Sequence, residues 1–399
     1  MTTSTTTDTK TFTDNPVWDL AFRPFFLLAS ISSIISLAIW IATLNGVVVR
    51  VEFSGLPINL WHAHEMTFGF GGAVAIGFLL TAVQTWTGNR SAHGSHLMLL
   101  TVFWIAARIA FLIMPENWVW ISIALQIAWW YLAIITLAKL ILSTNNKRNY
   151  VILPLISAIA TVNFFVLWFA ANHKVLLATQ FSHATVLLFC VLISVIGGRV
   201  IPFFTQRKIE SITIQKTPIL DKAIPLLTLV NIGVFLSPVS KTQVAVPAAL
   251  LITVGLLHLV RLFFWQPLKT VKIPLLWSLH LSYTFLGLGL ITLGVSYISD
   301  SIRFNDALHL ITIGTIGAMI LSMMSRVSLG HTGRPMTVNF TMTLAFVLIF
   351  ASAIVRFLLP IFNELITSWN LSAGLWILAF TLFLVKYTTV LIHPKLSTN

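Results

Sequence analysis

Repeated apolar runs of 18 or more residues constrain this chain more than any other feature of its sequence. A run of that length with few charges is long enough to cross the hydrocarbon core of a bilayer as an α-helix. The composition agrees, because 57% of the 399 residues are hydrophobic and only 9% are charged, whereas a soluble domain carries about 25% charged residues. A transmembrane barrel would instead show short alternating strands. The sequence therefore predicts an integral membrane protein made of helices.

The apolar runs divide into twelve predicted spans. They cover approximately residues 22–44, 61–86, 97–114, 118–142, 150–171, 174–197, 222–239, 243–265, 274–297, 306–325, 338–360 and 370–392. Several connections are very short, which makes neighbouring helices antiparallel. We predict an all-α fold in which residues 1–20 are a disordered cytoplasmic segment and residues 21–399 form one domain of about 12 transmembrane helices.

The distribution of positive residues predicts the orientation. If the N-terminus is inside, the inner connections hold most of the lysines and arginines, and the outer ones hold few. Cytoplasmic loops normally carry this excess of positive charge, so we expect both termini on the inside. The net charge of +13 does not indicate a nucleic-acid partner, because the positive residues are scattered and form no single basic face. The single cysteine, Cys190, lies in an apolar run and supplies no paired-thiol motif.

Histidine is the main ionisable residue at the predicted membrane depth. Ionisable groups there are costly, and they are functional hypotheses by default. Seven of the eleven histidines fall in or beside spans: His62, His64, His183, His258, His280, His309 and His331. Neutral imidazole is a usual ligand of haem iron, copper and zinc. The alternative for a lone histidine such as His258 is a hydrogen bond between helices.

The predicted topology places these histidines at two depths. The outer group, at the outer ends of two spans, is His62, His64 and His309. The deeper group is His183, His258, His280 and His331, of which the last lies in a predicted inner loop. Two groups at different depths suit two metal centres better than one.

The spacing in "WHAHE" (61–65) refines the outer group. Residues two apart on a helix point about 200° apart, so His62 and His64 are expected to face nearly opposite ways. They would then serve two different sites, or one site and one hydrogen-bond partner. Glu65, and Asp306 close before His309, are expected to accept the second imidazole N–H and fix the tautomer of a ligand.

Arginines form a second set of unusual residues. Arg108 and Arg356 fall within spans, while Arg23, Arg199 and Arg326 lie at inner boundaries. A guanidinium in this setting favours a carboxylate or phosphate partner. The spans contain too few acids to pair them all. The three boundary arginines are therefore candidates for binding haem propionates, with lipid headgroups and backbone carbonyls as the alternative partners.

Five stretches spread over nearly the whole chain resemble one family. They are "FRPFFLLA" (22–29), "WHAHEMTFGFGGAVAIGFLLTAVQTWTG" (61–88), "GRVIPFFT" (198–205), "LLWSLHLSYTFLGLG" (275–289) and "ALHLITIGTIGAMILSMMSRVSLGHTGRPM" (307–336). The sequence is similar to the NnrS family of bacterial membrane proteins. The resemblance implies haem and copper, and a link to denitrification and to nitric oxide resistance. The histidines that match the family's motifs are His62, His64, His280, His309 and His331.

The leading hypothesis is a protein of the bacterial cytoplasmic membrane that binds and reduces nitric oxide. The resemblance implies haem b, one or two per chain, with copper or a second iron, in an architecture analogous to subunit I of the haem–copper oxidases. Glu65 and Tyr283 are the candidate proton donors. Electrons would come from a quinol or another redox protein, since the chain has no haem-attachment motif of its own. The alternatives are a non-catalytic scavenger of nitric oxide and a transporter or chaperone for haem or copper.

Overall fold

The computed structural model describes residues 15–48 and 52–396, and it consists almost entirely of helices. Within these residues, twelve helical stretches are long and apolar enough to cross a membrane. The predicted all-α membrane fold is therefore confirmed. A hairpin of two short strands, β1 (Glu52–Phe53) and β2 (Leu56–Pro57), precedes the second span. Helices dominate because each one satisfies its own backbone hydrogen bonds in lipid, where water is absent.

The twelve spans contain nearly all of the regular structure. The first six are α1 (Phe22–Leu44); α2, η3 and α3 in one span (Ile58–His64, Glu65–Gly71, Gly72–Thr87); α4 (Gly94–Ile113); η4 and α5 (Glu116–Trp118, Val119–Ser143); η5 and α6 (Lys147–Asn149, Ile152–Ala171); and α7 (Val175–Lys208). The last six are α8 (Pro218–Leu236); α10 (Ala245–Phe263); α11 (Pro274–Val295); α12, η7 and α13 in one span (Phe304–His309, Leu310–Gly317, Ala318–His331); α14 and η8 (Phe340–Leu358, Leu359–Phe362); and α15 (Leu365–Ile392). The short helices between or before spans are η2 (Pro16–Trp18), α9 (Val239–Thr242) and η6 (Pro267–Thr270).

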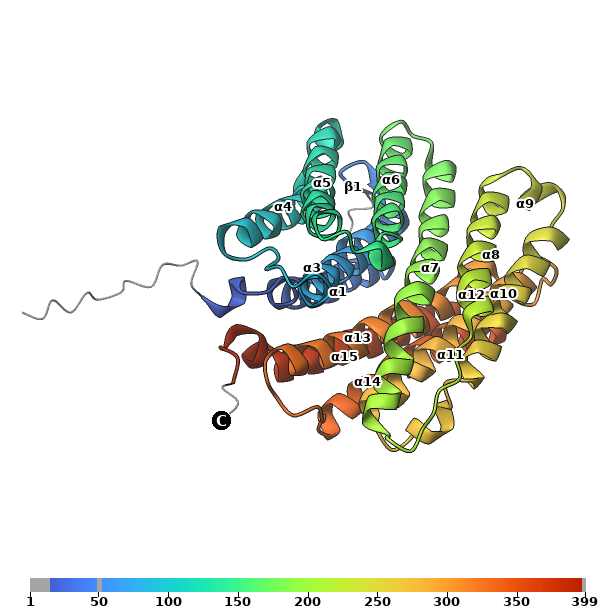
Figure 1. Cartoon of the computed structure of the whole chain (residues 1–399). Helices are drawn as coiled ribbons and strands as arrows, with labels where there is room; N and C mark the ends of the chain where they lie inside the picture. The colour runs from blue at the N-terminus through green and yellow to red at the C-terminus, as the bar shows by residue number, and fades with distance from the viewer. Residues whose placement is uncertain (1–14, 49–51, 397–399) are drawn as a thin grey trace, which may run out of the picture.

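The second and tenth spans are the most enclosed by protein. About three quarters of the apolar part of each is buried, 72% and 78%, whereas only 28% of the apolar part of α8 is buried. In Figure 1, α7 runs in green between α6 and α8. It also contacts α2, η7 and α11. The three spans that carry His62, His183 and His309 are thus brought together in the interior.

The second and tenth spans each contain a π-helix. The segment η3 follows His64 directly, and η7 follows His309 directly. A π-helix inside an α-helix is uncommon and occurs frequently at functional sites. In η3, the carbonyl of Gly69 accepts a hydrogen bond from the indole Nε1 of Trp104, at 3.1 Å. The altered winding is therefore supported by a side chain from α4.

The start of the first span lies beside the end of the last span. Arg23, near the start of α1, donates hydrogen bonds from Nη1 to the backbone carbonyls of Leu391 and His393, at 2.8 and 2.7 Å. An even number of spans places the two termini on the same side of the membrane, and this contact brings them next to each other. The predicted disorder of residues 1–20 needs correction at its boundary. Residues 1–14 lie outside the described part of the chain, but Pro16–Trp18 forms η2, which contacts α1, α4 and α15.

Two predicted loops begin later than expected. The helix α7 continues through Pro202 to Lys208, well beyond the end of the predicted span 174–197. His331 is the last residue of α13 and does not lie in a loop. The predicted ends were placed where the apolar character stops. A helix can continue beyond that point into polar surroundings, because its backbone hydrogen bonds do not depend on lipid.

The orientation can be tested with single cysteines in a Cys190→Ala background, since Cys190 is buried. Lys241 and Lys269 are exposed between successive spans on opposite sides of the bundle. We expect Lys241→Cys to react with a membrane-impermeant maleimide on intact cells, and Lys269→Cys to react only after permeabilisation. The reverse labelling pattern would show that the orientation predicted from the lysines and arginines is wrong and that both termini are outside.

Candidate functional site

Histidines from three spans line one cavity of about 290 Å³. His62 comes from α2, His183 from α7 and His309 from the end of α12. These are the second, sixth and tenth spans, so each histidine is four spans from the next. The volume lies near the lower end of the range of ligand pockets, about 300–1,000 Å³. We call this space the histidine cavity.

Aromatic rings hold the imidazoles of the histidine cavity in place. The ring of Trp40 stacks on that of His62, with the centroids 4.4 Å apart. The ring of Phe304 packs on His183 at 5.2 Å. Trp369 and Trp376 also line the cavity. The surroundings of the imidazoles are thus largely apolar, which limits access of water to them.

The hydrogen bonds of two imidazoles leave nitrogen atoms available. Nδ1 of His309 lies 2.5 Å from the backbone carbonyl of Asn305. Because a carbonyl can only accept, Nδ1 must carry the proton, and Nε2 keeps its lone pair. Nδ1 of His62 is buried and has no hydrogen-bond partner among the described residues. Both imidazoles can therefore act as ligands of a metal.

His64 faces away from the histidine cavity, as the two-residue spacing predicted. Its Nδ1 lies 3.0 Å from Oε1 of Glu65, and its ring packs 4.7 Å from that of Phe111. Glu65 also pairs with Arg108, at 3.1 Å. Arg108 in turn donates to Gln126, which donates to Asn163 on α6. Glu65 is therefore one member of a buried polar network across four spans, and it does not line the histidine cavity.

The expected outer group must be corrected. The structure brings His183 together with His62 and His309, and it separates His64 from them. Asp306 does not pair with His309. It forms an ion pair with Arg356, with 2.5 Å between Oδ1 and Nη1. The carboxylate of Asp306 pairs with Arg356 and not with an imidazole, because a guanidinium is permanently charged.

The Asp306–Arg356 ion pair separates two spaces. Arg356 lines the histidine cavity. Asp306 lines a second, smaller cavity of about 210 Å³ together with Asp300, Arg303 and Asn363, near the end of the bundle that is predicted to be outside. Both members of the pair are buried, with 6% or 7% of the side chain exposed. The pair is thus part of the wall between the histidine cavity and this polar outer cavity.

The deeper group of histidines does not form a metal cluster. Nδ1 of His258 is 2.8 Å from the hydroxyl of Tyr283, which also accepts from Arg261 at 3.0 Å. Nε2 of His280 is 2.8 Å from the hydroxyl of Thr205. In the described ranges, no three His, Cys, Asp or Glu side chains are placed to hold one metal ion. Tyr283 is accordingly a partner of His258 and Arg261, and it does not line the histidine cavity.

His331 and the three boundary arginines also lie elsewhere. The ring of His331 packs against Phe22, 5.8 Å away. Arg23 donates to the carbonyls at the end of α15, and Arg199 donates to Asn149 and to the carbonyl of Arg148. Arg326 lies over the ring of Phe204 at 3.6 Å. None of these arginines lines the histidine cavity, and backbone carbonyls, the alternative partners, are those seen for Arg23 and Arg199.

Two threonines that were not predicted as site residues, Thr67 and Thr312, also line the histidine cavity. A repeated pattern would have indicated them. The stretches "HEMTFG" (64–69) and "HLITIG" (309–314) share a histidine, a threonine three residues later and a glycine after two more. Each histidine is followed directly by one of the two π-helices. The second and tenth spans thus enter the cavity with the same local sequence and the same backbone distortion.

A family model described as NnrS protein matches residues 16–395, nearly the whole chain. The chain belongs to the NnrS family. It is therefore a multi-pass membrane protein linked to the response to nitric oxide. A search of curated proteins finds no match to the sequence. Both of the histidine-containing motifs, and all three histidines of the cavity, fall within the part matched by the NnrS model.

The ion pair should stabilise this NnrS-family protein. Asp306→Asn leaves the Arg356 guanidinium buried without its carboxylate, and breaking a buried pair in this way costs about 3–5 kcal/mol. We expect a clear fall in the thermal unfolding temperature of the detergent-purified protein. The control is Asp300→Asn, because Asp300 is exposed and its loss should change stability by no more than about 0.5 kcal/mol. Equal unfolding temperatures for the two variants would contradict a structural role for the pair.

Proposed function

We propose that the histidine cavity holds haem b and that nitric oxide binds there. The observation that carries the proposal is the convergence of His62, His183 and His309 from three spans on one largely apolar cavity. Membership of the NnrS family supports nitric oxide as the ligand. A ferrous haem supplies a coordination position for a diatomic molecule and can pass on single electrons.

The arrangement of donors fits haem better than copper. A haem iron takes four ligands from its own macrocycle and needs only one or two imidazoles from the protein. In the described part of the chain, no three His, Cys, Asp or Glu side chains lie close enough together to hold one metal ion, as a copper ion bound by three imidazoles would require. We propose that His309 would hold the haem iron, because its Nε2 is available and its ring is fixed by Asn305. His62, whose ring stacks on Trp40, and His183 would then contact the bound nitric oxide.

We further propose that the bound nitric oxide is reduced. Two molecules of nitric oxide, two electrons and two protons give one nitrous oxide and one water. The electrons would come from a quinol or another redox protein. Glu65 and Tyr283, which the sequence suggested as proton donors, belong to other networks, so we propose that protons would reach the histidine cavity from the polar outer cavity past the Asp306–Arg356 pair. We place the protein in the bacterial cytoplasmic membrane with both termini inside.

The haem proposal predicts a specific set of sensitive histidines. His309→Ala should lower the haem content of the purified protein by about tenfold or more, because loss of a ligand or its outer partner typically costs about 10–100-fold in affinity. His62→Ala and His183→Ala should keep the haem but change the spectrum of the nitric oxide adduct. The controls are His258→Ala and His280→Ala, which remove more deeply buried imidazoles outside the cavity. Equal loss of haem in the controls would contradict the assignment.

Turnover separates reduction from the alternatives. We expect the reduced protein to produce nitrous oxide from nitric oxide when a quinol is supplied. A stoichiometric haem signal that shifts with nitric oxide, without any nitrous oxide, would identify a scavenger. Haem that is labile and substoichiometric would favour a transporter or chaperone.

A further inference from the structure

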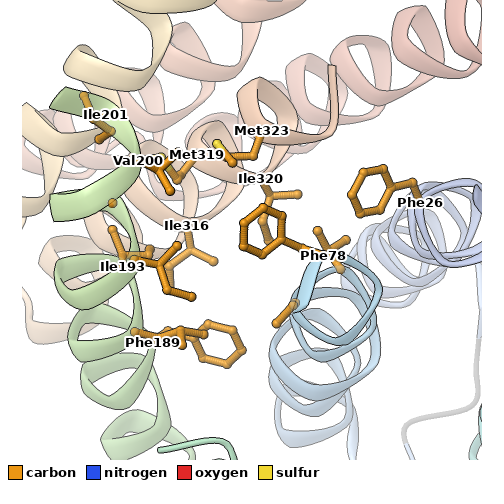
Figure 2. Close-up of a pocket in the computed structure, with 16 residues that line it drawn as sticks. Phe26, Phe78, Phe189, Ile193, Val200, Ile201, Ile316, Met319, Ile320 and Met323 are labelled. Atoms are coloured by element: carbon orange, nitrogen blue, oxygen red, sulfur yellow. The ribbon is translucent and has the colours of Figure 1, made fainter. Parts of the chain in front are cut away.

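A third cavity, distinct from the polar outer cavity, lies next to the histidine cavity. It has a volume of about 90 Å³ and lies between α3 on one side and α7 and α13 on the other (Figure 2). Every residue that lines it is apolar or glycine. Figure 2 shows Phe78 of α3 facing Phe189 and Ile193 of α7 across the space. We call it the apolar cavity.

The apolar cavity and the histidine cavity share a wall. Phe189 and Ile316 line both of them. Phe189 lies six residues after His183 on α7, and Ile316 lies in the π-helix that follows His309. Opposite Phe189 is Gly71, where an added Cβ would lie 3.4 Å from the edge of the phenylalanine ring. The wall between the two cavities is therefore formed by the side chains of Phe189 and Ile316. Gly71, on the facing helix, has no side chain to add to this wall.

The outer rim of the apolar cavity lies at the surface of the bundle. Ala75 and Phe78 of α3, Ile193 and Ile196 of α7, and Ile320 of α13 are only half-buried, whereas Phe189 and Ile316 are buried. All five rim residues belong to membrane-spanning helices. The rim is therefore expected to meet the acyl chains of the bilayer and not water.

The chemistry of the lining selects what can pass. Transfer of an ion or of an unpaired polar group into apolar surroundings costs several kcal/mol or more. A small uncharged molecule makes few hydrogen bonds to water and loses little in the same transfer. A volume of about 90 Å³ also excludes anything much larger than a diatomic or a few methylene groups. The lining thus suits a dissolved gas.

We propose that the apolar cavity is a lateral entrance through which small uncharged molecules, such as nitric oxide, pass from the membrane into the histidine cavity, with Phe189 and Ile316 as the inner partition. The proposal rests on the proposed function for the identity of the ligand, but not for the route. The route itself concerns any apolar gas. Protons and water would use the opposite side, at the Asp306–Arg356 pair.

Two variants block the entrance without touching the histidine cavity. Ala75→Phe fills the rim from α3, and Ile320→Trp fills it from α13; neither residue lines the histidine cavity. Because they act from different helices, a folding defect in one does not remove the test. The matched control is Ala160→Phe on α6, where a half-buried alanine lies outside both cavities.

The first measurement uses xenon as an apolar probe of the detergent-purified protein. Exchange of bound xenon, followed by ¹²⁹Xe NMR, should slow by about tenfold in Ala75→Phe and in Ile320→Trp, which is a barrier increase of about 1.4 kcal/mol. The exchange rate should not change in Ala160→Phe. Unchanged exchange in both blocking variants would overturn the proposal. An ordered acyl chain filling the apolar cavity in an experimental structure would also overturn it.

The second measurement uses nitric oxide and the reduced haem protein. A blocked entrance slows association and dissociation by the same factor, so Kd and the spectrum of the adduct should stay constant. A variant that changes Kd without slowing association would act on the site and would count against a route. If the wild-type protein shows no spectral change with nitric oxide, the proposed function fails. Slowed xenon exchange in the same variants would still support the entrance.

Discussion

Within a bilayer, a backbone N–H or C=O that loses its helical partner has no water to replace it. The two π-helices of this protein occur where that loss can be compensated by other parts of the protein. The second and tenth spans are the most enclosed, and in η3 the indole of Trp104 satisfies the carbonyl of Gly69. The wider winding directly after His64 and His309 changes which residues of these spans face inward. The histidine cavity depends on these two distortions, because Thr67 and Thr312 reach it from within them.

The cavity divides its surroundings by polarity. On one side, a buried ion pair separates it from a polar space near the predicted outer surface. On another side, Phe189 and Ile316 separate it from an apolar space near the lipid. A reaction that consumes both a dissolved gas and protons requires two such approaches, because no single lining admits both at low cost. The networks around Glu65 and Tyr283 contribute to packing between helices, and neither residue lines any of the three cavities.

The number of spans could be predicted from the sequence because span length is fixed by bilayer thickness. The opposite directions of His62 and His64 followed from helical geometry alone. The position of His183 did not follow, because α7 has 34 residues, more than a bilayer requires. The part of such a helix that lies at a given depth depends on its tilt and its neighbours, which local sequence does not specify. The pairing of Asp306 with Arg356, 50 residues away, is likewise a tertiary contact that local sequence does not specify. The threonines of the cavity could have been predicted, because the histidine–threonine–glycine pattern is repeated in the sequence.

The contact between Arg23 and the carbonyls of Leu391 and His393 joins the first span to the last across almost 370 positions of sequence. During synthesis, α1 leaves the ribosome long before α15 exists, and its guanidinium lacks these acceptors for the whole interval. An unpaired charge is costly in lipid, so the start of α1 is expected to stay at the membrane surface until the chain is nearly complete. The contact that joins the first span to the last can then form only after α15 has been synthesised.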